Sequence, residues 1–201
     1  MTARLIGGPD GDLRDRLLLV ALEEIRVVGA DDLSLRALAR KAGVSHQAPI
    51  HVFGSRRGLL TALVVVAVNH LAEEMAYAAS ESEAAHGPGH EVVLAIGLAY
   101  LEFALEDQAL FLLATRTDAL DMTNPALREA RDRAWSVLYD AVARAQATGW
   151  RAGQPTDLLS LLCWSLVQGV GAIYRDALAP EDLTARTPEQ LARALGDLLR
   201  D

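Results

Sequence analysis

The sequence predicts an all-α protein, and three observations support that prediction. Ala, Leu and Arg, which are strong helix formers, dominate its 201 residues. Apolar residues recur at helical spacing, and the alternation of β-branched and aromatic residues that is typical of strands is missing. The chain is 51% hydrophobic and 23% charged, as in an ordinary globular protein. We therefore expect about nine helices, in one domain or in two small ones.

The amino-terminal part predicts a mobile start followed by four helices. Residues 1–12 carry Gly7, Gly8 and Gly11 and no periodicity. Apolar spacing then predicts helices over 13–28, 35–42, 46–53 and 56–79. Ser34 and Ser45 are expected to cap the two short helices. Gly43 suits the turn between them, because glycine adopts positive φ without steric cost.

The rest of the chain predicts a linker and then five more helices. Ser80 to His90 is polar and contains Gly-Pro-Gly, which argues against a helix and against a metal site at His86 and His90. The predicted helices cover 91–106, 109–115, 124–148, 156–178 and a last segment after Thr187. Asn124-Pro125 is a typical helix start, and Thr187 to Gln190 reads as a capping box.

Charge and composition narrow the classes of function. The net charge is −8, but residues 1–60 carry nine basic and seven acidic residues, and the remainder carries ten and twenty. The five basic residues from Arg36 to Arg57 have no acidic residue between them, so this segment suits phosphate, although a solvated helix face has the same pattern. We expect no enzyme, cofactor or metal site, because phosphate-loop, hydrolase and zinc-protease motifs are missing.

Two further features concern the compartment. Cys163 is the single cysteine, which excludes an internal disulfide. No signal segment is found at the start, and the apolar run from Leu158 to Tyr174 is short for a membrane span. We expect a cytoplasmic protein in which that run forms a core or interface helix.

Residues 35–53 follow the plan of a helix-turn-helix motif. Small or apolar side chains stand where two crossing helices would touch, namely Leu38, Ala39, Ala42, Val44 and Phe53. Gly43 lies at the turn between the two helices. A helix pair of this length also arises by chance, so the local pattern alone is a moderate indication of DNA binding.

The segment "LSLRALARKAGVSHQAPIHVFGSRRGLLTALV" resembles the DNA-binding region of tetracycline-repressor (TetR) family regulators. The matching residues are Leu35, Arg36, Leu38, Ala39, Ala42, Gly43, Val44, Ser45, Phe53, Ser55, Arg56 and Leu59. Further on, "AYLEFALEDQALFLL" and "WSLVQGVGAI" are similar to the ligand-sensing domain of the Trp-His-Gly branch, with Gln168 in place of the histidine. The resemblance implies a helix-turn-helix DNA-binding domain over 13–58 and a helical ligand-binding and dimerisation domain over 59–201.

The resemblance also implies which residues meet DNA. A two-fold dimer would place the helix after Gly43 in the major groove of a palindromic operator. His46, Gln47 and Ala48 would face base edges, because Gln bonds adenine and Ala meets a thymine methyl. The residues expected at phosphates are Arg36, Ser45, His51, Arg56 and Arg57.

Three residues depart from the family pattern. Ile50 stands where the family has Tyr, and Val52 where it has His, and neither side chain donates a hydrogen bond. Pro49 removes a backbone donor, at limited cost early in a helix. These departures predict weaker DNA binding. They leave open an alternative, a dimeric ligand-binding protein of the same fold with weak or lost operator binding.

Aromatic residues on several carboxyl-terminal helices predict either a filled core or a cavity for a small molecule. The candidate cavity residues are Tyr100, Phe103, Phe111, Trp135, Trp164 and Gln168. Few charges lie in these helices, which favours a mostly apolar effector. The expected function is that of a homodimeric transcriptional regulator, a repressor released from its operator by that effector. Pairing is expected through the last two long helices, and Gly169, Gly171 and Ala172 suit either close helix pairing or core packing.

Overall fold

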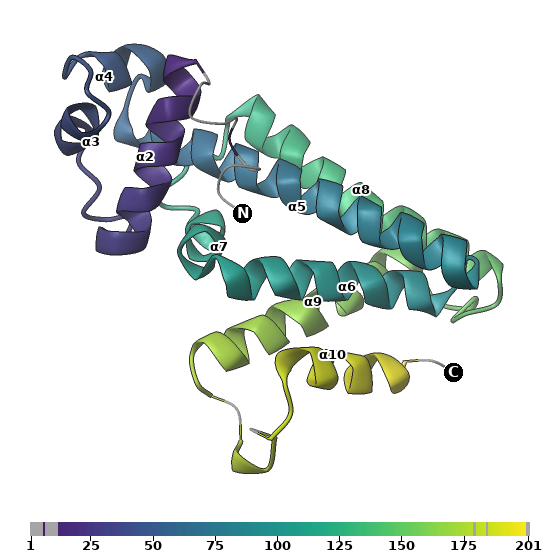
Figure 1. Ribbon diagram of the computed structural model, residues 1–201. Helices are drawn as coiled ribbons and strands as arrows, with labels where there is room; N and C mark the ends of the chain where they lie inside the picture. The colour runs from purple at the N-terminus through teal and green to yellow at the C-terminus, as the bar shows by residue number, and fades with distance from the viewer. Residues whose placement is uncertain (1–5, 7–11, 179, 184, 200–201) are drawn as a thin grey trace. The chain divides into compact units, whose positions relative to one another are not determined.

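The computed structural model describes residue 6 and residues 12–178, 180–183 and 185–199. Within these ranges it contains nine α-helices, one 3₁₀ turn and no strand, which confirms the predicted all-α class (Figure 1). The helices are α2 (Leu13–Val28), α3 (Leu35–Lys41), α4 (Ala48–Phe53), α5 (Arg56–His86), α6 (His90–Glu106), α7 (Gln108–Thr115), α8 (Pro125–Ala147), α9 (Thr156–Arg175) and α10 (Pro188–Asp197). The 3₁₀ turn η1 (Glu181–Leu183) lies between α9 and α10.

The chain forms two compact units. Unit 1 comprises Met1–His70 and Asp107–Arg131, and unit 2 comprises Leu71–Glu106 and Asp132–Asp201. Helices α5 and α8 each contribute to both units, and the chain enters unit 1 twice. These units are defined by contacts within the fold and do not decide where a DNA-binding domain ends. The predicted boundary after residue 58 therefore stays a prediction.

The core of unit 1 is made by leucines on α2, α3 and α5. Leu18, Leu22, Leu38 and Leu60 are fully buried, and α2 packs against both α3 and α7. Asp12 caps α2 by accepting a hydrogen bond from the Asp15 amide at 2.9 Å. Burial of these side chains contributes about 1.5–3 kcal/mol each relative to an exposed chain. The predicted helix over 13–28 is confirmed at both ends.

Helix α4 begins two residues later than predicted, at Ala48, and Ser45 does not cap it with its side chain. The cause is Pro49. A helix capped at Ser45 would need an amide at residue 49 to bond the Ser45 carbonyl, and proline has none. The Ala48 amide bonds that carbonyl instead, at 3.0 Å, and the first α-helical bond runs from His51 to Gln47, at 2.9 Å. Pro49 thus lies in the first turn, where it is tolerated.

The predicted linker over Ser80 to His90 is mostly wrong, because α5 continues to His86. Glu and Ala, good helix formers, are frequent in that segment, and they outweigh its serines. The helix stops at Gly87, whose φ is +76° and whose amide bonds the Glu83 carbonyl at 2.8 Å. Only Gly87 to Gly89 separates α5 from α6.

The predicted starts of α8 and α10 are confirmed. The Asn124 side chain accepts from the Leu127 amide at 3.2 Å. Thr187 and Gln190 form the expected capping box before Pro188. Helix α9 starts at Thr156 as expected but ends at Arg175, three residues before the predicted end.

Unit 2 is built around the contact of α6 with α9 and α10. Leu101 of α6, Val170 of α9 and Ala192 of α10 form its buried centre. A side-chain carbon at Gly171 would lie 3.7 Å from atoms of Leu101 and Ala104, so this glycine packs within unit 2. At Gly169 such a carbon would meet nothing within 4 Å. Core packing therefore accounts for Gly171, and Gly169 is not required by it.

Candidate nucleic-acid interface and ligand cavity

The turn before α4 presents the side chains that the sequence assigns to base edges. His46 and Gln47 are exposed in this turn, and Ala48, half-buried, is the first residue of α4. Gly43 has a φ of +68°, which allows the chain to reverse between α3 and α4. The structure therefore brings His46, Gln47 and Ala48 together at one surface of unit 1.

The face of α4 combines one polar and one apolar exposed side chain. His51 is exposed, Val52 is half-buried, and Pro49 is buried. Ile50 is 46% exposed on the same helix. Ile50 is thus at the surface, where a partner molecule can reach it.

The turn from α4 to α5 is fixed by backbone geometry. Gly54 has a φ of +72°, and the Ser55 hydroxyl accepts from the Gly58 amide at 3.1 Å, which caps α5. A side-chain carbon at Gly58 would lie 2.0 Å from the Phe53 carbonyl oxygen. Gly58 therefore permits the close approach that sets α4 against the start of α5.

The residues predicted to contact phosphates differ in the hydrogen bonds that they make within the protein. Arg36 and Ser45 are exposed. Arg56 donates from Nε to the Leu33 carbonyl at 3.1 Å and from Nη2 to the Ala30 carbonyl, so it fastens the segment between α2 and α3. Arg57 is exposed and donates to the Asp118 carbonyl at 3.1 Å. A phosphate contact by Arg56 stays a prediction, and its carbonyl contacts show a structural role as well.

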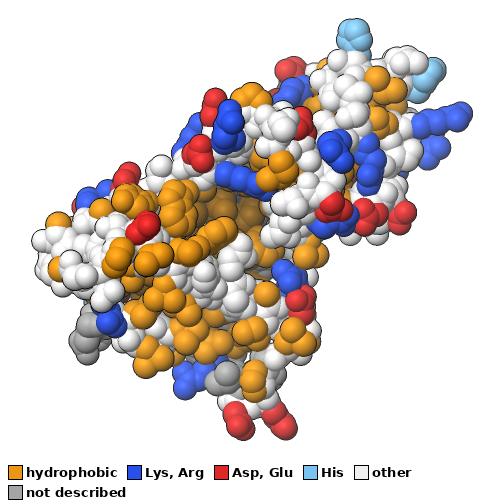
Figure 2. Space-filling model, turned by 180° about the vertical axis from the view of Figure 1, so that it is seen from behind, with side chains coloured by type: hydrophobic (Ala, Val, Ile, Leu, Met, Phe, Trp, Pro, Cys, Tyr) orange, Lys and Arg blue, Asp and Glu red, His pale blue; other side chains and the backbone are white. Residues whose placement is uncertain are grey.

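Other charges in unit 1 hold its loops. Arg116 donates to both Asp31 and Asp118, at 3.1 and 2.7 Å, and this contact lowers the pKa of Asp118 to about 2. Lys41 forms an ion pair with Glu24, so the charge of this lysine in the basic segment is partly neutralised. Figure 2 shows Lys, Arg and His side chains at the surface of unit 1, with Asp and Glu side chains among them.

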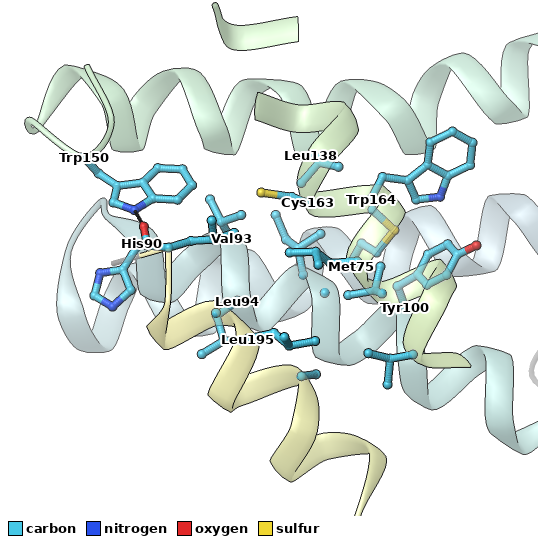
Figure 3. A pocket seen from close by; sticks show the side chains of 18 residues that line it. Met75, His90, Val93, Leu94, Tyr100, Leu138, Trp150, Cys163, Trp164 and Leu195 are labelled. Carbon is cyan, nitrogen blue, oxygen red and sulfur yellow. Dashed lines mark hydrogen bonds between the residues drawn. The ribbon is translucent and has the colours of Figure 1, made fainter. Parts of the chain in front are cut away.

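A cavity opens inside unit 2, between α6, α9 and α10 (Figure 3). The cavity is partly open to solvent, and the space between its walls that no atom fills is about 730 Å³ when that open solvent is counted. Its lining is almost entirely apolar and includes no Lys, Arg, Asp or Glu. The lining residues are Met75, His90, Val93, Leu94, Ile96, Gly97, Tyr100, Leu138, Trp150, Cys163, Trp164, Leu166, Val167, Val170, Ala192, Leu195, Gly196 and Leu199.

Two of the six predicted cavity residues, Tyr100 and Trp164, line this cavity. Trp135 packs against Trp164 in an edge-to-face arrangement, with ring centroids 6.2 Å apart. Phe103 is buried elsewhere in unit 2, and Gln168 is half-buried on α9. Phe111 is buried in unit 1, so it lies in the other unit.

Sequence reasoning missed several lining residues, among them His90, Trp150, Cys163 and those of α10. Trp150 follows a helix-ending glycine, and no periodicity marks such a position. Leu195 and Gly196 belong to a short amphipathic helix whose inner face has no aromatic residue. The signal that would have found them is the apolar face of that last helix.

Burial changes the titration of two polar side chains on the cavity wall, Tyr100 and Cys163. Burial raises the pKa of the Tyr100 phenol to about 12, although Trp164 beside it acts in the opposite direction. Burial also raises the pKa of the Cys163 thiol to about 11, which keeps it protonated and unreactive. Figure 3 shows Trp150 and His90 toward one end of the cavity, and Trp164 and Tyr100 toward the other.

The two histidines at the junction of α5 and α6, His86 and His90, each lie beside an oxygen of their own helix. The described ranges contain no group of three or more His, Cys, Asp or Glu side chains that could hold an ion. His86 Nδ1 lies 3.2 Å from the Ser82 carbonyl oxygen, and His90 Nε2 lies 3.1 Å from a Glu91 carboxylate oxygen. Each histidine thus has a neighbour from its own helix.

Helix α9 has an exposed apolar face. Leu158, Leu161, Leu162 and Trp164 are all at least 40% exposed. Helices α5 and α9 are long and apolar enough to cross a membrane. One or two such helices are weak evidence of a membrane protein, because the core helices of soluble proteins share this property. The apolar stretch of α5 is 56% buried, as expected of a core helix, but that of α9 is only 22% buried. The exposed face of α9 is therefore an apolar surface that a partner would cover.

A helix-turn-helix with an exposed second helix, followed by a helical unit that contains an apolar cavity, is typical of DNA-binding transcriptional regulators. Family comparison agrees with this class. Residues 17–63 match the model described as bacterial regulatory proteins of the tetR family, and residues 93–199 match the tetracyclin repressor-like carboxyl-terminal domain. The second match alone spans more than half of the chain, and the chain belongs to the TetR family of transcriptional regulators. Assignment to the Trp-His-Gly branch stays a prediction.

Solved structures share the fold along nearly the whole chain. A protein with unknown function from Rhodococcus sp. RHA1 is 27% identical, with a TM-score of 0.83 and 95% of each chain covered. The TetR family transcriptional regulator PfmR from Thermus thermophilus is 21% identical, with a TM-score of 0.67, covering 92% of this chain and 97% of its own. A putative tetR family regulator from Shewanella sp. PV-4 is 21% identical, with a TM-score of 0.69, over 92% and 96%. No curated protein matches the chain.

Regulators of this family bind DNA operators, act as dimers and are generally not enzymes.

Proposed function

We propose that this chain is a homodimeric repressor that leaves its operator when a small, mostly apolar molecule binds the cavity of unit 2. The observation that carries the proposal is the pairing of two features in one chain. Unit 1 exposes His46, Gln47 and His51 at the start of α4, and unit 2 holds a cavity whose lining is almost entirely apolar, as the walls of small-molecule sites are.

The DNA contacts that we propose are those of a recognition helix. His46, Gln47 and Ala48 meet base edges in the major groove, where the Gln47 amide bonds an adenine. The proposed phosphate contacts are Arg36, Ser45, His51, Arg56 and Arg57. In a dimer the two copies of α4 read the two halves of a palindromic operator, about one helical turn apart.

The exposed face of α9 supports a dimer. Leu158, Leu161 and Leu162 lie on this face, and burying them against a second copy removes apolar surface from water. The sequence placed pairing on the last two long helices, and of these α9 has the uncovered apolar face. We propose that α9 forms the centre of the interface between two copies.

Coupling between ligand and DNA would use α6. This helix supplies six of the residues that line the cavity, and Asp107 follows it directly. The buried Asp107 carboxylate pairs with Arg26 of α2 and also caps α7. Asp107 therefore ties α7 to α2 within unit 1, directly after α6 in the chain. The ligand would lower operator affinity by its preference for one of two states of the chain.

The exposed Ile50 favours one alternative, a ligand-binding dimer with weak or lost operator binding. A DNA-facing surface is normally polar and basic, and Ile50 is 46% exposed where a tyrosine hydroxyl would donate to a phosphate. The cations Arg36 and Arg57 on the same unit oppose this alternative.

A mobility-shift assay on the DNA upstream of the protein's own gene separates the two functions. We expect a specific band whose affinity falls as salt rises, and falls again in the Gln47→Ala variant by about tenfold, since a bidentate base contact is lost. Gln154→Ala, an exposed glutamine of unit 2, is the matched control and should bind as wild type. No specific band at either of two salt concentrations would refute the repressor and leave the ligand-binding dimer.

A further inference from the structure

The chemistry of the cavity in unit 2 narrows its ligand further than "mostly apolar". No side chain that lines it carries a permanent charge, so an ionised ligand would lose its hydration without gaining a counter-ion. The polar groups on the wall are a phenol, a thiol, an imidazole and two indoles. The indole of Trp150 already donates to the Leu199 carbonyl at 2.8 Å. Such a wall favours an uncharged ligand.

One wall of the cavity is the short helix α10. Ala192, Leu195, Gly196 and Leu199, which lies just after the helix, face the cavity. Leu191 and Leu195 pack on the buried centre of unit 2, and a carbon at Gly196 would lie 3.2 Å from Leu94. The helix contacts α6 and α9, the two other helices of the wall. Helix α10 therefore separates part of the cavity from solvent.

The outer face of α10 is polar, unlike the outer face of α9. Glu189, Gln190, Arg193 and Asp197 are exposed there, and Arg193 donates to Glu189 at 3.1 Å. A polar face stays in water when two copies pair through α9. The described residues between α9 and η1, and those from 185 to 187, are exposed as well. Within the described part of the chain, the outer face of α10 therefore makes no apolar contact that would hold the helix in place, and its inner face and its two ends must do so.

The far end of α10 is fastened by two neighbouring residues from the turn after α8. Trp150 Nε1 donates to the Leu199 carbonyl, drawn as a dashed line in Figure 3, and Arg151 Nε donates to the same oxygen at 3.2 Å. Arg151 Nη2 also points to the Leu198 carbonyl, at 3.4 Å. Arg151 has a φ of +47°, a left-handed conformation that costs energy for a residue with a side chain. The near end is held by the Tyr174 hydroxyl, which donates to the Arg186 carbonyl at 2.7 Å.

We propose that α10 is the lid of this cavity, that Trp150 and Arg151 are its latch, and that the cavity admits an uncharged lipophilic molecule when the latch opens. The proposal rests on the proposed function only in taking that molecule as the effector. Its tests use no DNA. They can therefore fail while operator binding is observed, and operator binding can fail while they succeed.

The charge of the ligand is tested with two molecules that differ only in the head group. N-phenyl-1-naphthylamine, an uncharged fluorescent probe, is bound to the full chain and displaced with 1-decanol or with decanoate at pH 7.5. We expect decanol to displace the probe at a concentration at least about tenfold lower, because the carboxylate must be desolvated unpaired. Equal or better displacement by decanoate, or no binding of the probe, would overturn the uncharged class.

The lid is tested by the rate at which the probe leaves. Trp150→Phe keeps the ring and removes the Nε1 donor, and Arg151→Gln removes the guanidinium. Each loses about one hydrogen bond that holds the closed lid, so we expect stopped-flow dissociation to be about five- to tenfold faster. Association should accelerate as well, which leaves the dissociation constant less changed than either rate.

Arg193→Gln is the matched control, since it makes the same change on the outer face of the lid, away from the latch. It should release the probe at the wild-type rate. Circular dichroism checks that all three variants are folded. If both latch variants release the probe as slowly as wild type, or if Arg193→Gln is as fast as they are, the latch is refuted.

Discussion

The residues that we propose to decide operator binding lie in α4 and in the turn before it. His46, Gln47 and His51 are exposed and polar, whereas Ile50 is exposed and apolar. An apolar side chain at a phosphate offers no hydrogen bond. We therefore expect Ile50 and Val52 to affect the affinity for DNA more than the stability of the fold.

Restoring donors at these two positions should strengthen DNA binding. We expect the double variant Ile50→Tyr, Val52→His to bind the operator about fivefold or more tightly at fixed salt, since each new contact is worth about 0.5–1.5 kcal/mol. Fluorescence anisotropy with labelled operator measures the change. Val27→His, at a position 79% exposed on α2, is the control. An unchanged affinity would mean that residues 50 and 52 do not face the DNA backbone.

The single cysteine is expected to be slow to react. Burial raises the pKa of Cys163 from 9.0 to about 11, so at pH 8 its thiolate fraction is about 100-fold below that of an ordinary cysteine. Iodoacetamide labelling followed by mass spectrometry should show this retardation, and labelling should accelerate as pH rises toward the raised pKa. The same protein in urea is the control. Labelling as fast in the folded state would show an exposed thiolate and would reopen a redox role.

At the scale of elements, the turns between helices determine where the residues proposed to bind DNA are placed. Pro49 delays the start of α4, and Gly58 lets the start of α5 approach the end of α4. Each turn fixes where the recognition residues stand without touching DNA.

A methyl group at Gly58 should damage the joint between α4 and α5. The added carbon would lie 2.0 Å from the Phe53 carbonyl oxygen, so we expect Gly58→Ala to lower the free energy of unfolding by about 2 kcal/mol or more. Gly169→Ala adds the same group to α9 in open space and should stabilise the chain by about 0.5–1 kcal/mol. Urea unfolding compares the two variants. Equal stability of the two would contradict the close approach at Gly58.

For the whole molecule, the question is which apolar surface remains uncovered in one copy. The candidate is the outer face of α9, because α10 turns polar residues outward. If two copies pair through α9, each presents one α4 to DNA, and operator affinity depends on the dimer.

Charge on the α9 face should separate the two copies. We expect Leu161→Glu to weaken dimerisation by at least about tenfold, because a carboxylate would be buried in the interface, and to weaken operator binding with it. Light scattering coupled to size exclusion measures the mass. Tyr77→Glu, at a position 65% exposed on α5, serves as the control. A Leu161→Glu protein that remains a dimer would place the interface elsewhere.

The sequence by itself determined the helical class, the family motif and most helix limits, because these depend on local periodicity, caps and glycine turns. Asn124, Thr187 and Gly43 needed only their neighbours to be interpreted. Only the tertiary structure decided which aromatic residues border the cavity, since Phe103 and Phe111 are buried elsewhere while Trp150 and Leu195 line it. It also decided that Arg56 binds carbonyls and that α10 closes a wall. These facts depend on contacts between residues far apart in the chain, which local patterns do not record.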